Sequence, residues 1–145
     1  MKLANLAINS TVLLFGLITI ASVKAEDDAT FALRVCNASG VEDISLAVLS
    51  PLDTQDEWRL EGWWPVPDTG CKFINRFRGP VFYTYAMSAD YYWGADDAHQ
   101  CVNLRRRFDR TIGPQRYICA PTEVSVGFKR RVVESGSETY EITLR

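Results

Sequence analysis

Histidine is scarce in this sequence, which has one His, His99, among 145 residues. A zinc site of the His-Glu-x-x-His type needs two imidazoles, so this single chain cannot form one. No glycine-rich phosphate loop and no Gly-x-Ser-x-Gly elbow is present, which excludes the usual nucleotide fingerprints and the α/β-hydrolase nucleophile. The sequence therefore favours a protein that is not an enzyme and binds no cofactor. One alternative is a small hydrolase of the cell envelope that uses paired carboxylates, because Glu and Asp pairs leave no sequence signature. The other alternative is a purely structural envelope protein.

Long apolar runs are also scarce, and the one that exists lies near the start of the chain. Lys2 precedes an apolar run over residues 11–21, and Val23 and Ala25 occupy the small-residue positions that signal peptidase requires. The run is about half of the roughly 20 residues that a spanning helix needs. We predict a secretory signal peptide over residues 1–25, a periplasmic or secreted protein, and no transmembrane segment after cleavage. The alternative is a retained membrane anchor.

The charge balance is mildly acidic. The full chain has a net charge of −2, and removal of Lys2 and Lys24 with the signal leaves 14 basic against 18 acidic residues, a net charge of −4. This sign favours solubility and argues against nucleic acid as a partner. With 47% hydrophobic residues, the chain has the composition of a globular protein. We expect a flexible acidic segment over residues 26–30 and one domain over residues 31–145.

Four cysteines lie in the expected mature chain, namely Cys36, Cys71, Cys101 and Cys119. No pair has the Cys-x-x-Cys spacing of a zinc knuckle or a thioredoxin-type site. The even count, the wide spacing and the export signal predict two structural disulfides. All three connectivities remain open at this point, and four free buried thiols are the alternative.

Alternating apolar and polar residues predict short strands along the whole mature chain, and no stretch after the signal has a sustained helical period. Turns rich in Gly, Pro, Asp and Asn separate these strands. The pattern predicts an all-β fold, an antiparallel β-sandwich or barrel of about eight short strands. We expect residues 31–36 and 44–49 to form one hairpin, residues 124–133 and 139–144 to form another, and residues 101–108 to form a strand.

A series of short aromatic and cysteine motifs runs through the mature chain. In order they are Cys36-Asn37, Trp58, Gly62-Trp63-Trp64-Pro65-Val66-Pro67, Gly70-Cys71, Tyr83, Tyr85-Ala86, Trp93-Gly94, Cys101-Val102 and Cys119. This series resembles the bacterial family called domain of unknown function 1036. The chain departs from the family pattern at Asp68-Thr69 and at Arg105-Arg106-Arg107, in expected loops. The resemblance implies an exported, cysteine-bearing domain, and because the family has no known reaction it implies no catalytic role.

Two aromatic segments are the candidate binding residues. Rigid rings supply a large contact area at little entropic cost, so we expect any binding to involve both segments, with about half of their rings exposed. The expected partner is an envelope protein or a glycan. The alternatives are core packing for the first segment and rings folded over an open end of the sandwich for the second. The six residues are Trp58, Trp63, Trp64, Tyr91, Tyr92 and Trp93.

One cluster of potential metal ligands is present, formed by Asp90, Asp96, Asp97 and His99. Carboxylate oxygens suit Ca²⁺, and an imidazole suits Zn²⁺ or Cu²⁺. The spacing does not match an EF-hand loop. We interpret these residues as solvated loop charges and predict no metal.

Two basic patches stand out against the acidic balance. Arg105–Arg107, with Arg110 and Arg116, form one, and Lys129–Arg131 form the other. Charged residues protect the edges of sheets from aggregation, so we interpret both as charged sheet edges. The alternative is contact with anionic lipid headgroups or with an acidic partner.

Overall fold

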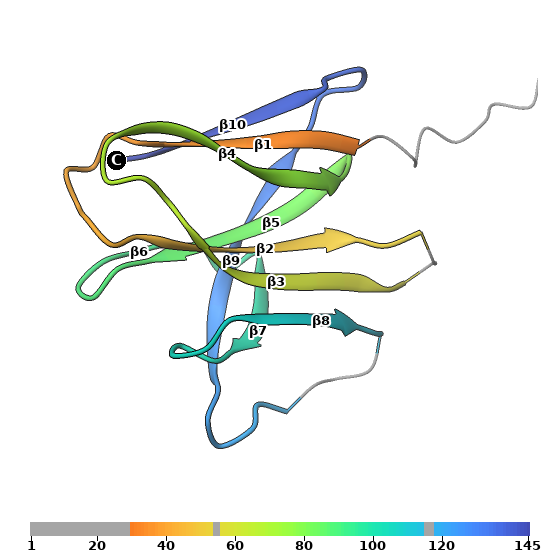
Figure 1. Ribbon diagram of the computed structural model, residues 1–145. Helices are drawn as coiled ribbons and strands as arrows, with labels where there is room; N and C mark the ends of the chain where they lie inside the picture. Colours follow the sequence, from red (N-terminus) through yellow and green to blue (C-terminus); the bar gives the residue numbers. More distant parts are fainter. Residues whose placement is uncertain (1–29, 54–55, 115–117) are drawn as a thin grey trace, which may run out of the picture.

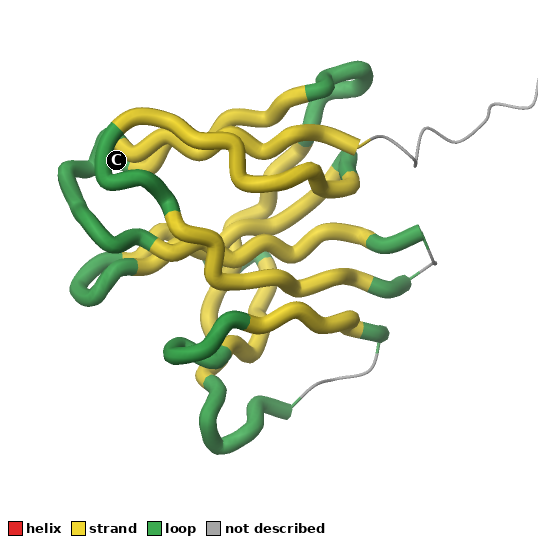
Figure 2. Tube along the Cα trace, viewed as in Figure 1, coloured by secondary structure: helices red, strands yellow, loops and turns green. Residues whose placement is uncertain are grey.

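The computed structural model describes residues 30–53, 56–114 and 118–145. The predicted signal peptide, residues 1–25, lies outside the described residues, as does all but Thr30 of the segment 26–30. The described residues form strands and loops without a helix (Figure 2), which confirms the all-β class, with ten strands where about eight were expected. The strands are β1 (Thr30–Asn37), β2 (Ser45–Pro51), β3 (Trp58–Pro65), β4 (Gly70–Arg78), β5 (Val81–Met87), β6 (Tyr92–Trp93), β7 (Ala98–Val102), β8 (Phe108–Ile112), β9 (Val124–Val132) and β10 (Thr139–Leu144).

The strands form two sheets (Figure 1). In the small sheet β1 lies between β10 and β4, parallel to β10 and antiparallel to β4. The large sheet is antiparallel, has the order β7-β9-β5-β2-β3-β8 with β6 beside β5, and curls into a half-barrel. The small sheet covers one face of the large sheet, and the curled part of the large sheet encloses a second core. The molecule thus combines a sandwich with a half-barrel.

Both expected hairpins are wrong. The first fails because β1 and β2 belong to different sheets. The Asn37 amide group donates hydrogen bonds to the carbonyl oxygens of Val41, Pro67 and Asp68, so the connection after β1 is bound to the connection between β3 and β4 and crosses between the sheets.

The second hairpin fails because β9 pairs with β5 and β7, whereas β10 pairs with β1. Phe128 of β9 packs in the half-barrel core, and Ile142 and Leu144 of β10 pack in the sandwich core. The two segments therefore bury these apolar residues in different cores and do not pair with each other as a hairpin.

Asn103 interrupts the strand expected over residues 101–108. Its side-chain Oδ1 accepts hydrogen bonds from the backbone N–H groups of Arg105 and Arg106, at 3.0 and 3.1 Å. These bonds hold a turn, so β7 ends at Val102 and β8 begins at Phe108. The three arginines 105–107 therefore lie in a loop.

The second basic patch, Lys129–Arg131, lies in β9. The register pairs these residues with β5 on one side, whereas β7 pairs with β9 only over residues 124–128, so no described strand pairs with Lys129–Arg131 on their other side. The interpretation as a sheet edge is therefore wrong for Arg105–Arg107, which lie in a loop. Arg116, assigned to the first patch, lies outside the described residues.

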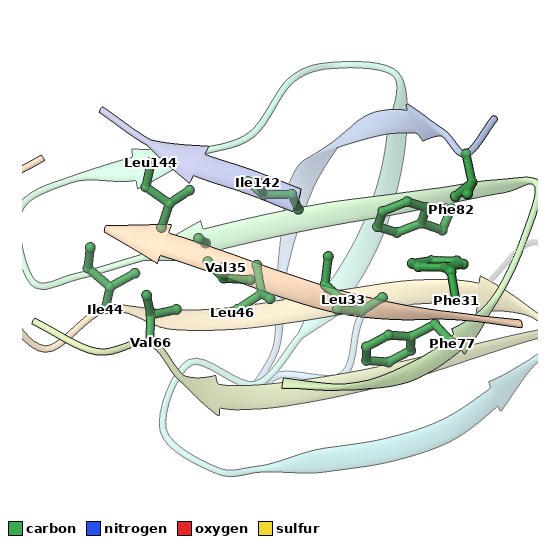
Figure 3. Packing of buried hydrophobic residues seen from close by; sticks show 13 residues of the cluster. Phe31, Leu33, Val35, Ile44, Leu46, Val66, Phe77, Phe82, Ile142 and Leu144 are labelled. Atoms are coloured by element: carbon green, nitrogen blue, oxygen red, sulfur yellow. The ribbon is translucent and has the colours of Figure 1, made fainter. Parts of the chain in front are cut away.

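The sandwich core lies between the two sheets (Figure 3). Leu33 and Val35 of β1 face Leu46 and Val48 of β2, and all four are at most 1% exposed. Phe82 of β5 is fully buried against two aromatic rings of the small sheet, those of Phe31 and Tyr140. Burial of these side chains is the main force that holds the sheets together.

The half-barrel core lies on the opposite face of the large sheet. Ala47 and Leu49 alternate with Leu46 and Val48 along β2, so this strand is buried on both faces. Phe128 is fully buried within the half-barrel. The second core gives the curled part of the sheet its own apolar support.

Two disulfides are present, which confirms the prediction from the four cysteines. Cys36 of β1 is bonded to Cys71 of β4, and Cys101 of β7 is bonded to Cys119. The first joins neighbouring strands of the small sheet at one register position. The second attaches the segment before β9 to the outer strand of the half-barrel.

Arg110 of β8 connects the two outer strands of the half-barrel. Its guanidinium donates hydrogen bonds to the Cys101 carbonyl oxygen of β7 and to the Glu123 carboxylate. The other Glu123 oxygen accepts a hydrogen bond from the backbone N–H of Ala120, at 3.0 Å. These contacts close the gap between β8 and β7, which share no backbone ladder in the described sheets. Within the same ranges, no helix is long and apolar enough to cross a membrane.

Candidate functional site

The six aromatic residues that the sequence singles out differ widely in exposure. Tyr91 is 60% exposed and Tyr92 is 73% exposed, whereas Trp63 is only 9% exposed. The other three, Trp58, Trp64 and Trp93, are half-buried. Two large rings thus stand next to each other in solvent on the hairpin between β5 and β6.

Tyr85 connects the two aromatic segments inside the half-barrel. Its ring stacks on that of Tyr92, with centroids 6.3 Å apart and planes inclined by 22°. The Tyr85 ring also packs on Trp63, at 6.2 Å between centroids. Burial raises the pKa of the Tyr85 hydroxyl, with a smaller contribution from Tyr92, so Tyr85 stays neutral. The exposed Tyr92 therefore rests on a fixed aromatic row.

The remaining three aromatic residues do not join this row. Trp58 packs edge-on against Tyr83, with centroids 5.6 Å apart. Trp64 lies on the sandwich side and packs edge-on against Phe77. Trp93 also packs on the sandwich core, and its indole Nε1 donates to the Arg145 carbonyl oxygen at 2.9 Å. These three rings have structural partners of their own.

Trp63 supports the loop between β7 and β8. Its indole Nε1 donates a hydrogen bond to the Asn103 carbonyl oxygen, at 2.9 Å. The Asn103 side chain in turn accepts hydrogen bonds from the backbone N–H groups of Arg105 and Arg106. The bond from Trp63 and these two bonds together hold the loop that contains Leu104. Trp63 thus acts as an anchor for a loop rather than as an exposed contact.

Two cavities meet at Leu104, which is 43% exposed. The smaller, of about 170 Å³, lies between Leu104, Trp63 and the start of the β5–β6 hairpin at Ser88 and Ala89. The larger, of about 490 Å³, lies between the loop 103–106 and residues 121–124. A hydrogen bond from the Ser88 N–H to the Tyr91 carbonyl oxygen, at 2.8 Å, closes the β5–β6 hairpin that carries both tyrosines.

We call this surface the aromatic–basic groove and define it by Tyr91, Tyr92, Leu104, Arg105 and Arg106. The guanidinium groups of Arg105 and Arg106 are exposed, and neither forms an ion pair with a carboxylate of the described residues. The smaller cavity, lined by Ser88 and Ala89 on one side and Leu104 on the other, connects the hairpin of the tyrosines with the loop of the arginines.

Sequence reasoning missed Asn103 and Leu104, because the alternation of residues 101–108 is the same for a strand and for this turn. It also missed the link through Tyr85, because the contacts of Tyr85 with Trp63 and Tyr92 join segments far apart in the sequence.

The acidic cluster after the tyrosines is open and solvated. The Asp96 carboxylate lies 3.4 Å from the imidazole Nε2 of His99, and Asp97 accepts a hydrogen bond from the Arg130 backbone at 2.8 Å. Among the residues that the structure describes, no three His, Cys, Asp or Glu side chains form a set that could hold a metal ion.

A pair of carboxylates lies on β3 and β8. The register places Glu61 directly opposite Asp109. Arg59 donates to both oxygens of Asp109, at 2.8 and 2.6 Å, and lies 3.7 Å from Glu61. The hydrogen bonds from Arg59 lower the pKa of Asp109, whereas burial raises the pKa of Glu61, an effect that Arg59 opposes.

Carboxylates with pKa values shifted in opposite directions are typical of acid–base catalysis. A hydrolase, however, needs the ionised carboxylate free to attack or to activate water. Both oxygens of Asp109 accept hydrogen bonds from Arg59, so this pair is better suited to binding than to hydrolysis.

No family model matches the chain, and neither a curated protein nor a solved structure matches it. The resemblance to domain of unknown function 1036 therefore stays a hypothesis.

Proposed function

We propose that the protein is an exported, non-enzymatic binding module whose partner docks on the aromatic–basic groove. The observation that carries this proposal is that the hairpin with the two exposed tyrosines shares a cavity with Leu104, through Ser88 and Ala89. Leu104 also lines a second cavity together with the unpaired Arg105 and Arg106. Two disulfides are typical of proteins in oxidising compartments and fit the signal peptide expected over residues 1–25.

The groove favours an acidic segment of an envelope protein as its partner. Tyrosine and arginine are enriched at protein–protein contacts. Arg105 and Arg106 carry two positive charges without a partner in the described chain, and complementary charge directs both association and choice of partner. A neutral glycan would use the tyrosine rings but leave both arginines without a role.

The loop that carries Arg105 and Arg106 is held before any partner arrives. The Asn103 side chain and the Trp63 indole together supply three hydrogen bonds to it. A fixed loop loses little conformational freedom on binding, so more of the contact energy contributes to affinity.

Selection from a random peptide library displayed on phage tests this function. We expect the purified wild-type protein to enrich peptides that contain Asp or Glu beside an apolar residue. The variants Tyr92→Ala and Arg105→Gln/Arg106→Gln should each bind a selected peptide about tenfold or more weakly, because a central contact residue typically contributes more than about 1 kcal/mol. Isothermal titration calorimetry measures these affinities.

Two matched controls separate the groove from the rest of the surface. Phe73→Ala removes a ring that is 57% exposed on β4, and Lys129→Gln/Arg130→Gln removes two charges from β9. Both variants should bind the selected peptide as the wild type does. Enrichment without acidic residues, or an equal loss in the control variants, would contradict the proposal.

A further inference from the structure

A separate cavity of about 320 Å³ opens between β3 and β8, which lie side by side in Figure 1. Leu60 packs inside the half-barrel, so its neighbour Glu61 points to the opposite face of the sheet. Glu61 and Asp109 form one wall of this cavity, and Trp64 and Arg107 also line it. None of these four residues belongs to the aromatic–basic groove.

The acidic wall has more negative charge than its arginine neutralises. Arg59 is bound through two short hydrogen bonds to Asp109, and its contact with Glu61 is an ion pair at 3.7 Å, beyond hydrogen-bond distance. The Glu61 side chain is only 11% exposed, so water solvates it poorly. Burial raises its pKa, and the charge of Asp109 adds to the rise. A second cation near Glu61 would therefore be strongly stabilised.

The other wall offers unused donors. The guanidinium carbon of Arg107 lies 5.3 Å from the centre of the Trp64 ring. Stacking uses the face of a guanidinium and leaves its N–H edges free. No carboxylate in the described part of the chain pairs with Arg107. The indole Nε1 of Trp64 is buried and lacks an acceptor, so this side holds a second unsatisfied donor.

Phe108 and Gly62 form an apolar surface between these walls. The Phe108 ring lies so close to Gly62 that a side-chain Cβ there would come within 2.5 Å of it. The absence of a side chain at Gly62 therefore allows the ring of Phe108 to approach the backbone of β3 closely. The cavity thus has an acidic side, a basic side and an aromatic surface, and its four charged groups, Arg59, Glu61, Arg107 and Asp109, sum to zero.

We propose that this cavity binds a free α-amino acid, with the ammonium group of the ligand on Glu61 and its carboxylate on Arg107. A zwitterion adds no net charge to a cavity that is itself neutral, and it satisfies both walls at once. An amine alone leaves Arg107 without an acceptor, and a carboxylate alone leaves Glu61 without a cation. Trp64 and Phe108 provide contact for the ligand side chain.

Isothermal titration calorimetry with L-alanine and L-phenylalanine tests this site, with ethylamine and propionate as the two half-ligands. We expect at least one amino acid to bind tenfold or more tightly than either half-ligand. Glu61→Gln keeps the shape of the side chain and removes its charge, and Arg107→Gln removes the exposed cation. Each variant should weaken amino-acid binding at least tenfold.

The exposed ion pair between Arg34 and Glu141 on the small sheet provides the matched control. Arg34→Gln and Glu141→Gln make the same chemical changes elsewhere and should leave binding unchanged. Tyr92→Ala should also leave it unchanged, which separates this site from the aromatic–basic groove. Thermal melts of every variant identify any loss of folding. If Glu61→Gln unfolds, Arg107→Gln, at an exposed position, still tests the site.

Three results would overturn the proposal. One is the absence of saturable binding of either amino acid up to about 10 mM, the range expected for so small a ligand. Another is equal affinity for an amino acid and a half-ligand. The third is a loss in Glu141→Gln as large as that in Glu61→Gln.

Discussion

Phe82→Ala is expected to lower the free energy of unfolding by about 3–5 kcal/mol, the range measured when a buried Phe is truncated. Phe82 is fully buried in the sandwich core. Its ring lies 4.7 Å from that of Phe31 in β1 and 5.1 Å from that of Tyr140 in β10. It therefore joins the large sheet to two strands of the small sheet.

The expected loss of stability is large because the cavity left by truncation of Phe82 cannot close easily. Phe31 and Tyr140 are attached to paired strands of the other sheet, so they cannot move inward without disturbing the β1–β10 ladder. Equilibrium unfolding in urea, followed by tryptophan fluorescence, measures the change. Phe73→Ala, at a ring 57% exposed, should change stability by less than about 0.5 kcal/mol. A similar small change for Phe82→Ala would contradict the described core.

Loss of both disulfides is expected to destabilise the protein by about 4–8 kcal/mol, at about 2–4 kcal/mol for each bond. The bonds span sequence separations of 35 and 18 residues, and each restricts the unfolded chain. Because they lie in different sheets, their effects should add. The sum is comparable with the total stability of a typical domain, about 5–15 kcal/mol.

The variant with all four cysteines replaced by Ala should therefore melt at a far lower temperature than the wild type or fail to fold. Circular dichroism melts of this variant and of the two single-bond variants measure the effect. Alkylation of the denatured, non-reduced wild-type protein should label no cysteine. Labelled cysteines, or a four-Ala variant that melts within a few degrees of the wild type, would contradict the account.

The sequence predicted which segments form strands better than it predicted which strands pair with each other. Alternation marks a strand when one of its faces meets a core and the other does not, and that local signal is strong in β1. It does not indicate which strand lies alongside. The parallel pair β1–β10 joins Arg34 to Glu141, residues from opposite ends of the described chain, and no local pattern reveals such a contact.

The same limit explains what the sequence revealed of the sites. Tyr91 and Tyr92 stood out because adjacent large rings in an expected loop are typical of a contact surface. The Asn103 turn was missed because its residues also alternate like a strand. Glu61 and Asp109 came together only through the register of β3 and β8, which depends on a pairing between distant segments.

Site-specific photo-crosslinking tests the central claim, that the aromatic–basic groove binds a partner, most directly. A photoreactive phenylalanine analogue is placed at position 92, 104 or 73 of the full chain in the cells that produce it, and the adducts are identified by mass spectrometry. We expect positions 92 and 104 to form an adduct with the same envelope protein, and position 73 to form none with it. Equal adducts at all three positions, or none at 92 and 104, would contradict the account.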